Sequence, residues 1–251
     1  MQSIKSNEIV KKINNLRKKN INNFQSNYFF TQIEEDILYA ENNDALIFLS
    51  REKTFYKLFY AFVDAVSFSN LLKDLPDINI YLEIISKQEP SHDLQTALKP
   101  YFEYKTTYQK LYKKLDVIEK KIPVISTVDI DLIFEKLYQS FDIYFEHLMQ
   151  KEELIELASN NKVITIYENN EMTSFIIYKV QGTKAYLNQI ANYGSKSNLI
   201  DLWKKFYLAL NNDGIKYLDL WYNKQNKKAE NMYNIEQFQP LNMFNYCYKK
   251  V

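Results

Sequence analysis

The segment Asn226-Lys-Lys-Ala-Glu-Asn-Met-Tyr-Asn-Ile-Glu-Gln-Phe238 lies near the C-terminus and follows an apolar stretch, residues 217–222, that predicts a strand. If the segment is helical, Asn226, Ala229 and Tyr233 share one face, with Asn226 at the N-terminal end. The last residue of the segment, a phenylalanine, comes five residues after Tyr233. We therefore expect the helix to end there and a final strand to begin.

This spacing resembles the closing motif of the GCN5-related N-acetyltransferases (GNAT), in which Asn, a small residue, Tyr and Phe recur at positions 0, +3, +7 and +12 after a strand. All four positions match. The family usually has Gly just before the Phe, whereas this chain has Gln237, so the turn must form without the residue that most easily takes a positive φ. The alternative is that Ala229 and Tyr233 only pack a C-terminal helix, which makes the order of the surrounding elements decisive.

The second half of the chain, residues 123–251, predicts the element order of that family. Thr127 or Asp129 can cap the first, strongly amphipathic helix. We expect helices over residues 130–148 and 154–158, strands over 163–167, 173–180 and 185–191, a helix over 195–210, a strand over 215–222, a helix over 226–233 and a strand over 243–249. This order matches the GNAT core. The expected fold class is α/β (α+β), with a mixed, mostly antiparallel sheet flanked by helices.

The first half of the chain predicts a second, degenerate unit of the same kind. We expect helices over residues 5–24, 67–75 and 94–101 and strands over 45–49, 55–62 and 78–85, while residues 102–115 fit either a strand or a helix. Pro123 follows a charged run and marks the expected boundary. The expected domains are a degenerate GNAT-like unit over 1–118 and an acyl-CoA-binding catalytic unit over 123–251, without a residue-level repeat between them.

Composition excludes several classes of protein. The formal net charge is only +1, which argues against a nucleic-acid or membrane-surface footprint. The 21 Tyr and 16 Phe, against 3 Gly and 5 Pro, exclude disordered and fibrous classes. The single cysteine, Cys247, permits no disulfide framework or cysteine-based metal cluster within the chain, and no run approaches the length of an apolar membrane span. We expect a cytoplasmic protein without metal, nucleic-acid or membrane partners, and a homodimer remains open.

The resemblance implies a loop for the pyrophosphate of coenzyme A (CoA) between the strand 185–191 and the next helix. A helix N-terminus with free N–H groups suits such an anion. The residues expected to line it are Asn192, Gly194, Ser195, Lys196, Ser197 and Asn198. The family's loop is R/Q-x-x-G-x-G/A, and this chain offers only Gly194. An ordinary capped turn therefore remains the alternative.

The resemblance also implies roles around the thioester. Tyr233 would give a proton to the departing thiolate, and Asn226 would bond to the pantetheine region, so these two are the expected catalytic residues. The other residues expected to bind the cofactor, acetyl-CoA or CoA, are Gln189, Ile190, Ala191 and Ala229, the first three through backbone pairing with the pantetheine arm.

The sequence names no base for an incoming amine. His147, at the end of the expected helix 130–148, is expected to be solvated or to cap that helix. Asp219, Glu168 and Glu171 are expected to be exposed carboxylates. Many members of the family work through water or through the proximity of an already neutral amine, so a missing base does not argue against activity.

The leading hypothesis is an N-acyltransferase that moves an acetyl or other acyl group from acyl-CoA to a primary amine of a small molecule, peptide or protein. One alternative is a tRNA-dependent aminoacyl transferase with two such units, against which the near-neutral charge speaks. Another is a catalytically silent protein that keeps the fold for binding or dimerisation, which the missing glycines favour. The acceptor and the acyl-chain preference cannot be read from the sequence.

Overall fold

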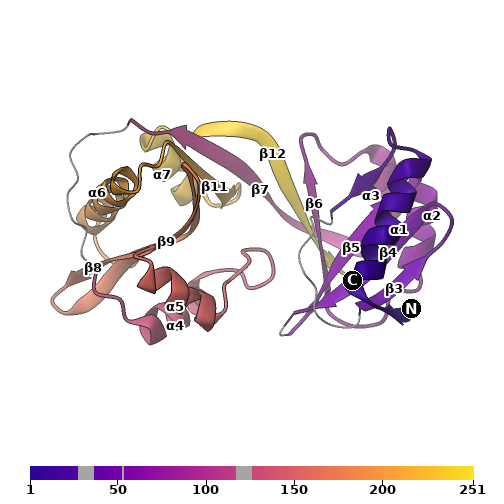
Figure 1. Cartoon of the computed structure of the whole chain (residues 1–251), viewed down its shortest axis with the longest axis horizontal. Helices are drawn as coiled ribbons and strands as arrows, with labels where there is room; N and C mark the ends of the chain where they lie inside the picture. Colours follow the sequence, from indigo (N-terminus) through magenta and orange to yellow (C-terminus); the bar gives the residue numbers. More distant parts are fainter. Residues whose placement is uncertain (28–36, 53, 117–125) are drawn as a thin grey trace. The chain divides into compact units, whose positions relative to one another are not determined.

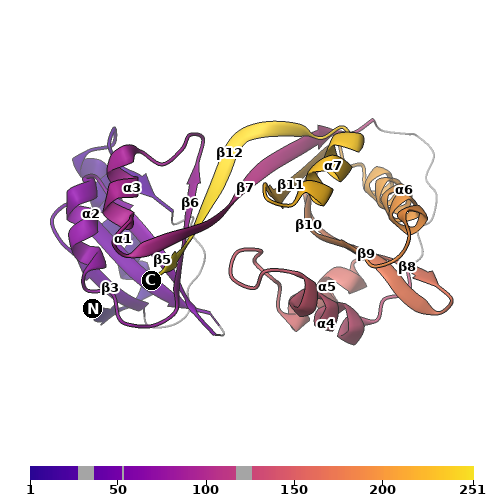
Figure 2. The same ribbon diagram turned by 180° about the vertical axis from the view of Figure 1, so that it is seen from behind.

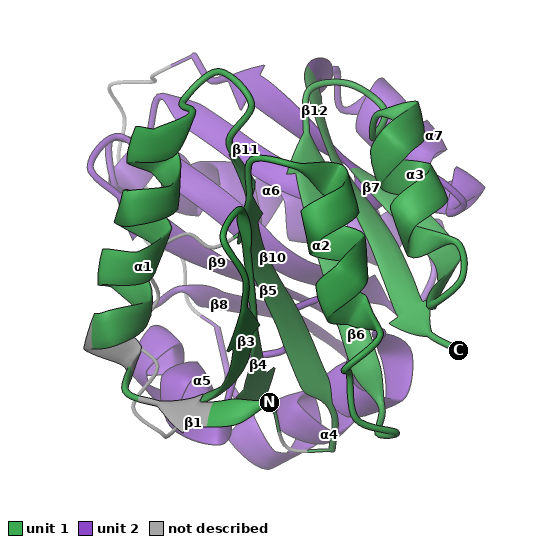
Figure 3. Cartoon of the chain, turned by 90° about the vertical axis from the view of Figure 1, so that its right-hand side faces the viewer, with its two compact units in different colours: residues 1–108, 242–251 green, residues 109–241 purple. Residues whose placement is uncertain are grey.

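The computed structural model describes residues 1–27, 37–52, 54–116 and 126–251. These residues form two compact units, which Figure 3 colours separately. Unit 1 comprises Met1–Tyr108 and Asn242–Val251, and unit 2 comprises Gln109–Leu241. Both units have the expected fold class, a mixed and mostly antiparallel sheet flanked by helices.

Unit 1 builds its sheet in the order β1-β3-β4-β5-β6-β12, with β2 paired to β5. Its elements are β1 (Gln2–Ile4), α1 (Ser6–Lys19), β2 (Gln25–Ser26), β3 (Ile37–Glu41), β4 (Ala45–Arg51), β5 (Tyr56–Phe62), α2 (Ala65–Leu72), β6 (Ile80–Ser86), α3 (His92–Leu98) and β7 (Phe102–Lys114). The β4–β5 hairpin confirms the expected pair of strands. β5 and β6 are parallel because α2 crosses between them.

Unit 2 builds its sheet in the order β7-β11-β10-β9-β8. Its elements are α4 (Ile130–Ser140), α5 (Lys151–Ser159), β8 (Val163–Glu168), β9 (Glu171–Gln181), β10 (Lys184–Asn192), α6 (Lys196–Asn212), β11 (Tyr217–Asn223), α7 (Lys227–Ile235) and β12 (Gln239–Lys250). β8, β9 and β10 form the expected antiparallel meander, and β10 and β11 are parallel. Both units therefore repeat one order: three antiparallel strands, a helix, a parallel strand, a helix and a last strand.

Alternation along the strands gives each sheet two buried faces. In unit 1, Leu46 and Phe48 of β4 pack with α1, whereas Ile47 and Leu49 pack with α2 and α3. In unit 2, one face of the meander packs on α6 and α7 and the opposite face packs on α4 and α5. Figures 1 and 2 show these two helix layers on either side of β9 and β10. No helix in the described parts of the chain is long and apolar enough to cross a membrane.

Each unit completes its sheet with a strand from the other half of the sequence. Asn242–Val251 belongs to unit 1, where β12 pairs antiparallel with β6 from Phe244↔Ser86 to Lys249↔Tyr81. In unit 2, the end of β7 lies beside β11. The compact units therefore divide at Tyr108 and again at Leu241. The boundary predicted from the sequence, at 118–123, lies outside the described residues. Local patterning predicted that 243–249 is a strand, but it could not select the partner of that strand.

The helix expected over residues 130–148 is shorter than the pattern predicted. α4 ends at Ser140, and Phe141 has an extended backbone with φ −120° and ψ 152°. Beyond it, the Asp142 carboxylate accepts a hydrogen bond from the backbone N–H of Tyr144 at 2.7 Å. Such local side-chain bonding offers the backbone an alternative to the helix. Phe145 is still buried, but it lies in a packed loop after the helix and not in a helical turn.

Candidate active site

The parallel strands β10 and β11 separate part-way along their length. They pair from Lys184↔Tyr217 to Leu187↔Leu220, whereas β10 stays paired with β9 as far as Asn192↔Ser174. An irregularity in the β9 register between Leu187 and Gln189 coincides with this separation. In the described chain, the backbone of β10 beyond Leu187 therefore has no strand partner on its β11 side. A strand edge of this kind can pair with an extended ligand.

Two buried polar atoms lie at the point of separation without a partner. Gln189 is 2% exposed, and its Nε2 donates to the backbone carbonyl of Glu146 at 3.4 Å. Its Oε1, like Oδ1 of the neighbouring Asn188, is buried and has no hydrogen bond within the described chain. Leaving such an acceptor unpaired costs about 1–3 kcal/mol. A ligand with N–H donors would remove that cost.

Tyr233 is buried on α7 among aromatic rings, at 4% exposure. Its ring centroid lies 5.5 Å from that of Phe238, 6.0 Å from that of Tyr222 and 6.5 Å from that of Trp203, each in an edge-on arrangement. These contacts hold the ring in one orientation. Among the described residues, its hydroxyl has no hydrogen-bond partner, so the proton is free to be donated to a ligand.

The environment of Tyr233 keeps its phenol protonated. Burial raises the pKa of Tyr233 well above its ordinary value of 10, and the negative charge of Glu146 raises this pKa further. A raised pKa means that the neutral phenol persists at pH values where an exposed tyrosine would begin to ionise. Tyr233 is therefore suited to act as a proton donor at neutral pH and not as a base.

Asn226 is the N-cap of α7. Its Oδ1 accepts a hydrogen bond from the backbone N–H of Ala229 at 3.0 Å, and its side chain is exposed. Capping of this kind typically contributes about 1 kcal/mol. The three-residue spacing between Asn226 and Ala229 is thus explained by the start of the helix, and contact of either residue with a cofactor stays a prediction.

The turn after α7 forms without glycine, as expected from the presence of Gln237 at this position. Gln237 takes the left-handed backbone conformation with φ +59°. The next residue, Phe238, is buried, and its N–H donates to the carbonyl of Tyr233 at 3.0 Å. Backbone and side chain of Phe238 therefore both contact Tyr233, which ties the end of the helix to the phenol.

The loop between β10 and α6 is short and largely bonded to itself. Only three residues separate Asn192 from Lys196. The N–H groups of Tyr193 and Gly194 donate to the carbonyl of Thr173 at 2.7 and 3.2 Å, and the N–H of Ser195 donates to Asn198 Oδ1 at 2.7 Å. In the described chain, the amides of Lys196 and Ser197 remain without an acceptor. Two free amides at the end of a 17-residue helix still favour an anion.

A carboxylate stands at the same helix end. Glu168 Oε2 accepts from Asn198 Nδ2 at 3.2 Å, while Asn198 and Ser195 cap α6 reciprocally. The negative charge of Glu168 complements the helix dipole in the way that a bound anion would. Glu168, expected to be only an exposed carboxylate, therefore has a structural partner and competes with an anionic ligand for this position.

Gly194 is required by packing and not by a positive φ. A Cβ at this position would lie 2.6 Å from Asn198 Oδ1 and 2.8 Å from Thr173 Cβ. We expect Gly194→Ala to destabilise the protein by about 1–3 kcal/mol because the capped loop must shift to make room. Thermal unfolding measures the change. Gly182→Asn is the control, because Gly182 faces open space at φ +60°, which Asn tolerates. Equal unfolding midpoints for wild type and Gly194→Ala would contradict the crowding.

Comparison with solved structures reveals the fold of the chain. A GNAT-family acetyltransferase from Colwellia psychrerythraea superimposes with a TM-score of 0.53 at 9% identity, over 99% of this chain and 98% of that one. A GCN5-related N-acetyltransferase from Sphaerobacter thermophilus gives a TM-score of 0.54 at 9% identity, over 82% and 80% of the two chains. The chain has the GNAT fold. A tandem GNAT protein from the clavulanic acid biosynthesis pathway is also similar, with a TM-score of 0.50 at 7% identity, over 83% and 78%.

Comparison of sequences adds nothing to this likeness. No family model matches the chain, and no curated protein matches it. The similarity is therefore one of fold, and the chemistry has to be argued from the residues themselves.

Asp219 and His147 have surroundings in the GNAT fold that differ from those expected from the sequence. Asp219 was expected to be exposed, but it is 2% exposed and paired with Lys110 at 3.0 Å and Lys184 at 3.2 Å. Two ammonium groups neutralise it, which suits a structural role. His147 lies outside α4, at φ +47°, because the helix ends earlier than expected. No cluster of His, Cys, Asp and Glu suited to a metal occurs in the described part of the chain.

Two residues at the site were missed by sequence reasoning. Glu146 lies in the segment that the sequence predicts as a continuous helix, yet its carbonyl accepts from Gln189 and its charge acts on Tyr233. Asn188 lies beside Gln189, and its Oδ1, like Gln189 Oε1, is buried without a hydrogen-bond partner in the described chain. No local sequence pattern marks either residue. The contact of Glu146 with β10 joins two segments about forty residues apart in the chain.

Proposed function

We propose that unit 2 is an N-acyltransferase that moves an acetyl or other acyl group from acyl-CoA to a primary amine. The observation that carries this proposal is the free edge of β10 with the buried, unpaired Gln189 Oε1. Glu146 connects that edge to the neutral phenol of Tyr233, because its carbonyl binds Gln189 and its charge acts on Tyr233. The fold likeness is consistent with acyl transfer in general.

The residues along β10 fit the arm of the donor. Acyl-CoA supplies a thioester at the end of an extended arm that contains two amide groups. The backbone of residues 189–192 would pair with these amides, and Gln189 Oε1 would accept from an N–H of the arm. The amine nitrogen would then bond the acyl carbon as the carbon–sulfur bond breaks, and Tyr233 would give its proton to the leaving sulfur. The nitrogen would lose one proton to water to give the neutral amide, and the Tyr233 phenolate would regain a proton from water. The acceptor is proposed only as a primary amine on a small molecule, peptide or protein.

The fit to the pyrophosphate is weaker. The free amides of Lys196 and Ser197, with the Lys196 side chain exposed beside them, would hold an anion at the start of α6. Glu168 opposes this, because its carboxylate stands at the same helix end. We infer that most of the affinity for the donor comes from the arm along β10.

Removing the charge of Glu168 is expected to tighten donor binding. Glu168→Gln keeps an oxygen that can accept from Asn198 Nδ2 but removes the repulsion of a pyrophosphate. We expect CoA to bind about three- to tenfold more tightly, since one charge near the ligand contributes on the order of 1 kcal/mol. Titration calorimetry with CoA measures this. Glu171→Gln, an exposed carboxylate across the same hairpin, is the control, and weaker binding by Glu168→Gln would contradict the assignment.

A second candidate is a GNAT-fold protein that binds no CoA. The observation that favours it is the self-bonded loop, in which Tyr193, Gly194 and Ser195 give their amides to the protein and Glu168 supplies the anion. Such a protein would keep the fold for binding or dimerisation.

Thermal unfolding with saturating acetyl-CoA, CoA and longer acyl-CoAs separates the two candidates. An acyl donor at about 100 times its Kd should stabilise the native state by about 2.7 kcal/mol and raise the unfolding midpoint by several degrees. Release of free thiol from acetyl-CoA in the presence of a panel of amines then tests turnover. No thermal shift with any of these ligands would overturn the proposed donor site and favour the second candidate.

A further inference from the structure

Unit 1 contains the same separation of parallel strands as unit 2. β5 and β6 pair only from Tyr56↔Ile80 to Leu58↔Leu82, although β5 continues to Phe62. In unit 2 the last parallel pair is Leu187↔Leu220. Beyond Leu58, the edge of β5 would expose N–H and C=O groups that need partners.

In unit 1, the chain itself fills this separation. β2 pairs antiparallel with β5, with Gln25 opposite Phe62 and Ser26 opposite Ala61. Ser26 Oγ and the N–H of Asn27 both donate to the carbonyl of Tyr60, at 2.8 and 3.3 Å. Residues 25–27 therefore act as a short strand along the edge that β6 leaves free.

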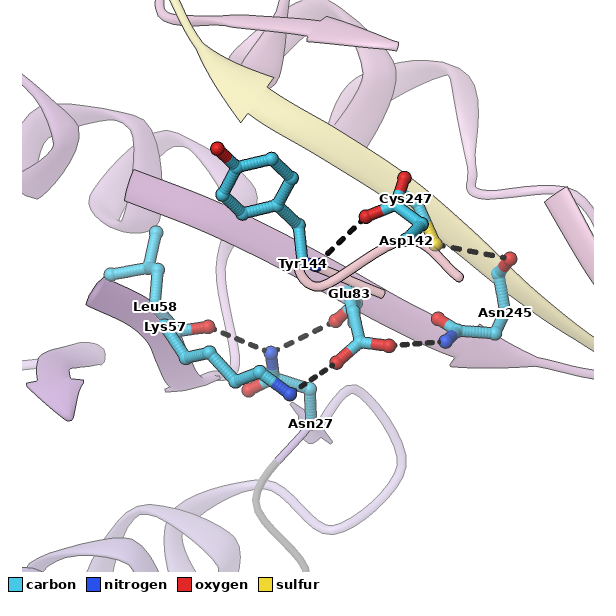
Figure 4. A network of polar contacts seen from close by, with 8 residues as sticks. All are labelled: Asn27, Lys57, Leu58, Glu83, Asp142, Tyr144, Asn245 and Cys247. Carbon is cyan, nitrogen blue, oxygen red and sulfur yellow. Dashed lines mark hydrogen bonds and ion pairs between the residues drawn. The ribbon is translucent and has the colours of Figure 1, made fainter. Parts of the chain in front are cut away.

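The side chain of Asn27 joins the two separated strands. Its Oδ1 accepts from the N–H of Tyr60 at 2.7 Å, and its Nδ2 donates to the carbonyls of Leu58 on β5 and Glu83 on β6, at 3.0 and 2.9 Å. Figure 4 shows the amide group of Asn27 between Leu58 and Glu83. Asn27 is 8% exposed, so these bonds replace water almost completely.

The network continues outward from Glu83. Its carboxylate pairs with Lys57 at 3.3 Å and accepts from Asn245 Nδ2 at 2.5 Å (Figure 4). Lys57 belongs to β5 and Asn245 to β12, so the strands on both sides of β6 are tied to it. The carboxylate of Glu83 is therefore committed to structure, while its carbonyl holds Asn27.

The registers show which atoms of unit 2 correspond to those that Asn27 satisfies. Tyr60 is two positions beyond the last parallel residue of β5, opposite Ile47 of β4. In unit 2, Leu187 is the last parallel residue of β10 and lies opposite Tyr178 of β9. Two positions further along β9 is Ile176, which lies opposite Ile190, so Ile190 corresponds to Tyr60. On the side of β10 that faces β11, no segment of the described chain pairs with β10 there, and Gln189 Oε1 remains unpaired. The chain itself fills the separation between the parallel strands of unit 1, whereas no described segment fills the separation in unit 2.

We propose that residues 25–27 are a built-in occupant of the space between the separated strands β5 and β6. Unit 1 therefore does not bind the extended arm of an acyl-CoA donor. The chain then has a single donor site, in unit 2. The start of α2 agrees with this, because only two residues separate it from β5 and its N-cap is Asp64, whose carboxylate accepts from Ser67 N–H at 2.7 Å. An acidic cap disfavours a phosphate group. The single-site part of this inference rests on the proposed function, whereas the filling of unit 1 does not.

Residue-resolved amide hydrogen exchange tests the built-in occupant. In the wild type, the Tyr60 N–H should exchange at least about 100-fold more slowly than an unstructured amide. Asn27→Ala removes its acceptor and should speed this exchange about tenfold or more, while amides of β9 in unit 2 stay unchanged. Asn23→Ala, a substitution of an exposed side chain four residues earlier, is the control and should change nothing. Fast exchange of Tyr60 in the wild type would overturn the proposal even if Asn27→Ala failed to fold.

The same measurement with CoA tests the number of sites. We expect protection of residues 190–192 and of the first turn of α6, and none of residues 59–62. Protection of β5 in the wild type would overturn the proposal. If CoA protects neither unit, the donor site proposed for unit 2 fails, and the filling of unit 1 is judged by the Tyr60 amide alone.

Discussion

Replacing Tyr233 by Phe is expected to lower kcat about 10²- to 10⁴-fold while CoA binding changes little. The substitution removes only the hydroxyl, and the ring keeps its edge-on contacts with Phe238, Tyr222 and Trp203. Among the described residues, the hydroxyl has no hydrogen bond to lose, so the fold should be unaffected. Steady-state kinetics with acetyl-CoA, together with calorimetric titration of CoA, separates turnover from binding.

The neighbouring ring provides the control for this prediction. Tyr222→Phe removes a hydroxyl that already contacts Gln109 at 3.4 Å and Glu230 at 3.5 Å, and it should leave kcat within a few-fold of wild type. The alkaline side of the pH profile adds a second check. Because the pKa of Tyr233 is raised above 10, loss of its proton should not reduce the rate between pH 7 and 9. Equal turnover by Tyr233→Phe would remove this residue from the mechanism.

Removing Asn242–Val251 is expected to unfold unit 1. The deletion takes away the strand that pairs with β6 and the side chains of Cys247 and Tyr248, which are 0% and 8% exposed. A large buried side chain such as Tyr248 contributes about 1.5–3 kcal/mol, the smaller Cys247 contributes less, and each backbone hydrogen bond to β6 contributes about 0.5–1.5 kcal/mol. Several such losses reach the total stability of an ordinary domain, about 5–15 kcal/mol. Amide exchange over β4 and β5 measures the effect directly.

The control for the truncation is removal of Val251 alone. Val251 is 71% exposed and lies after the end of β12, so its loss costs at most the hydrogen bond that its N–H makes to Tyr101. The same argument predicts that a chain shortened to residues 1–118 cannot form unit 1 on its own. Slow, native-like exchange of β4 and β5 in the truncated protein would contradict the assignment of Asn242–Val251 to unit 1.

Elements with a strong local period were predictable. The meander, the helix after β10 and the strand before α7 follow from alternation and helical spacing, which depend on neighbours within a few residues. The failure over 141–148 is also local in origin. Apolar spacing continued past Ser140, but the hydrogen bond between Asp142 and Tyr144 favoured a turn, and the apolar residues found burial without a helix. β1, β2 and β3 carried too little pattern to be predicted.

For the candidate site, the sequence identified side chains but not their surroundings. The motif located Tyr233, and the structure adds its buried ring contacts and the charge of Glu146 that hold its proton. The resemblance also pointed to Gly194, and the structure shows that glycine is needed there because Asn198 and Thr173 leave no room for a Cβ. Asn226 was assigned to a cofactor by resemblance, whereas the hydrogen bond present is a helix cap. Interactions between distant segments decide each of these environments except the last.

By itself, the sequence determined the α/β class, the order of elements in the second half and the place of Tyr233 after the last parallel strand, because these depend on periodicity along the chain. Only the tertiary structure decided that β12 completes unit 1, that residues 25–27 fill one pair of separated strands and that the other pair stays open. The physical reason is that backbone N–H and C=O groups are the same at every residue. Which distant strand satisfies them is settled by burial and register, and neither is written in any local stretch of sequence.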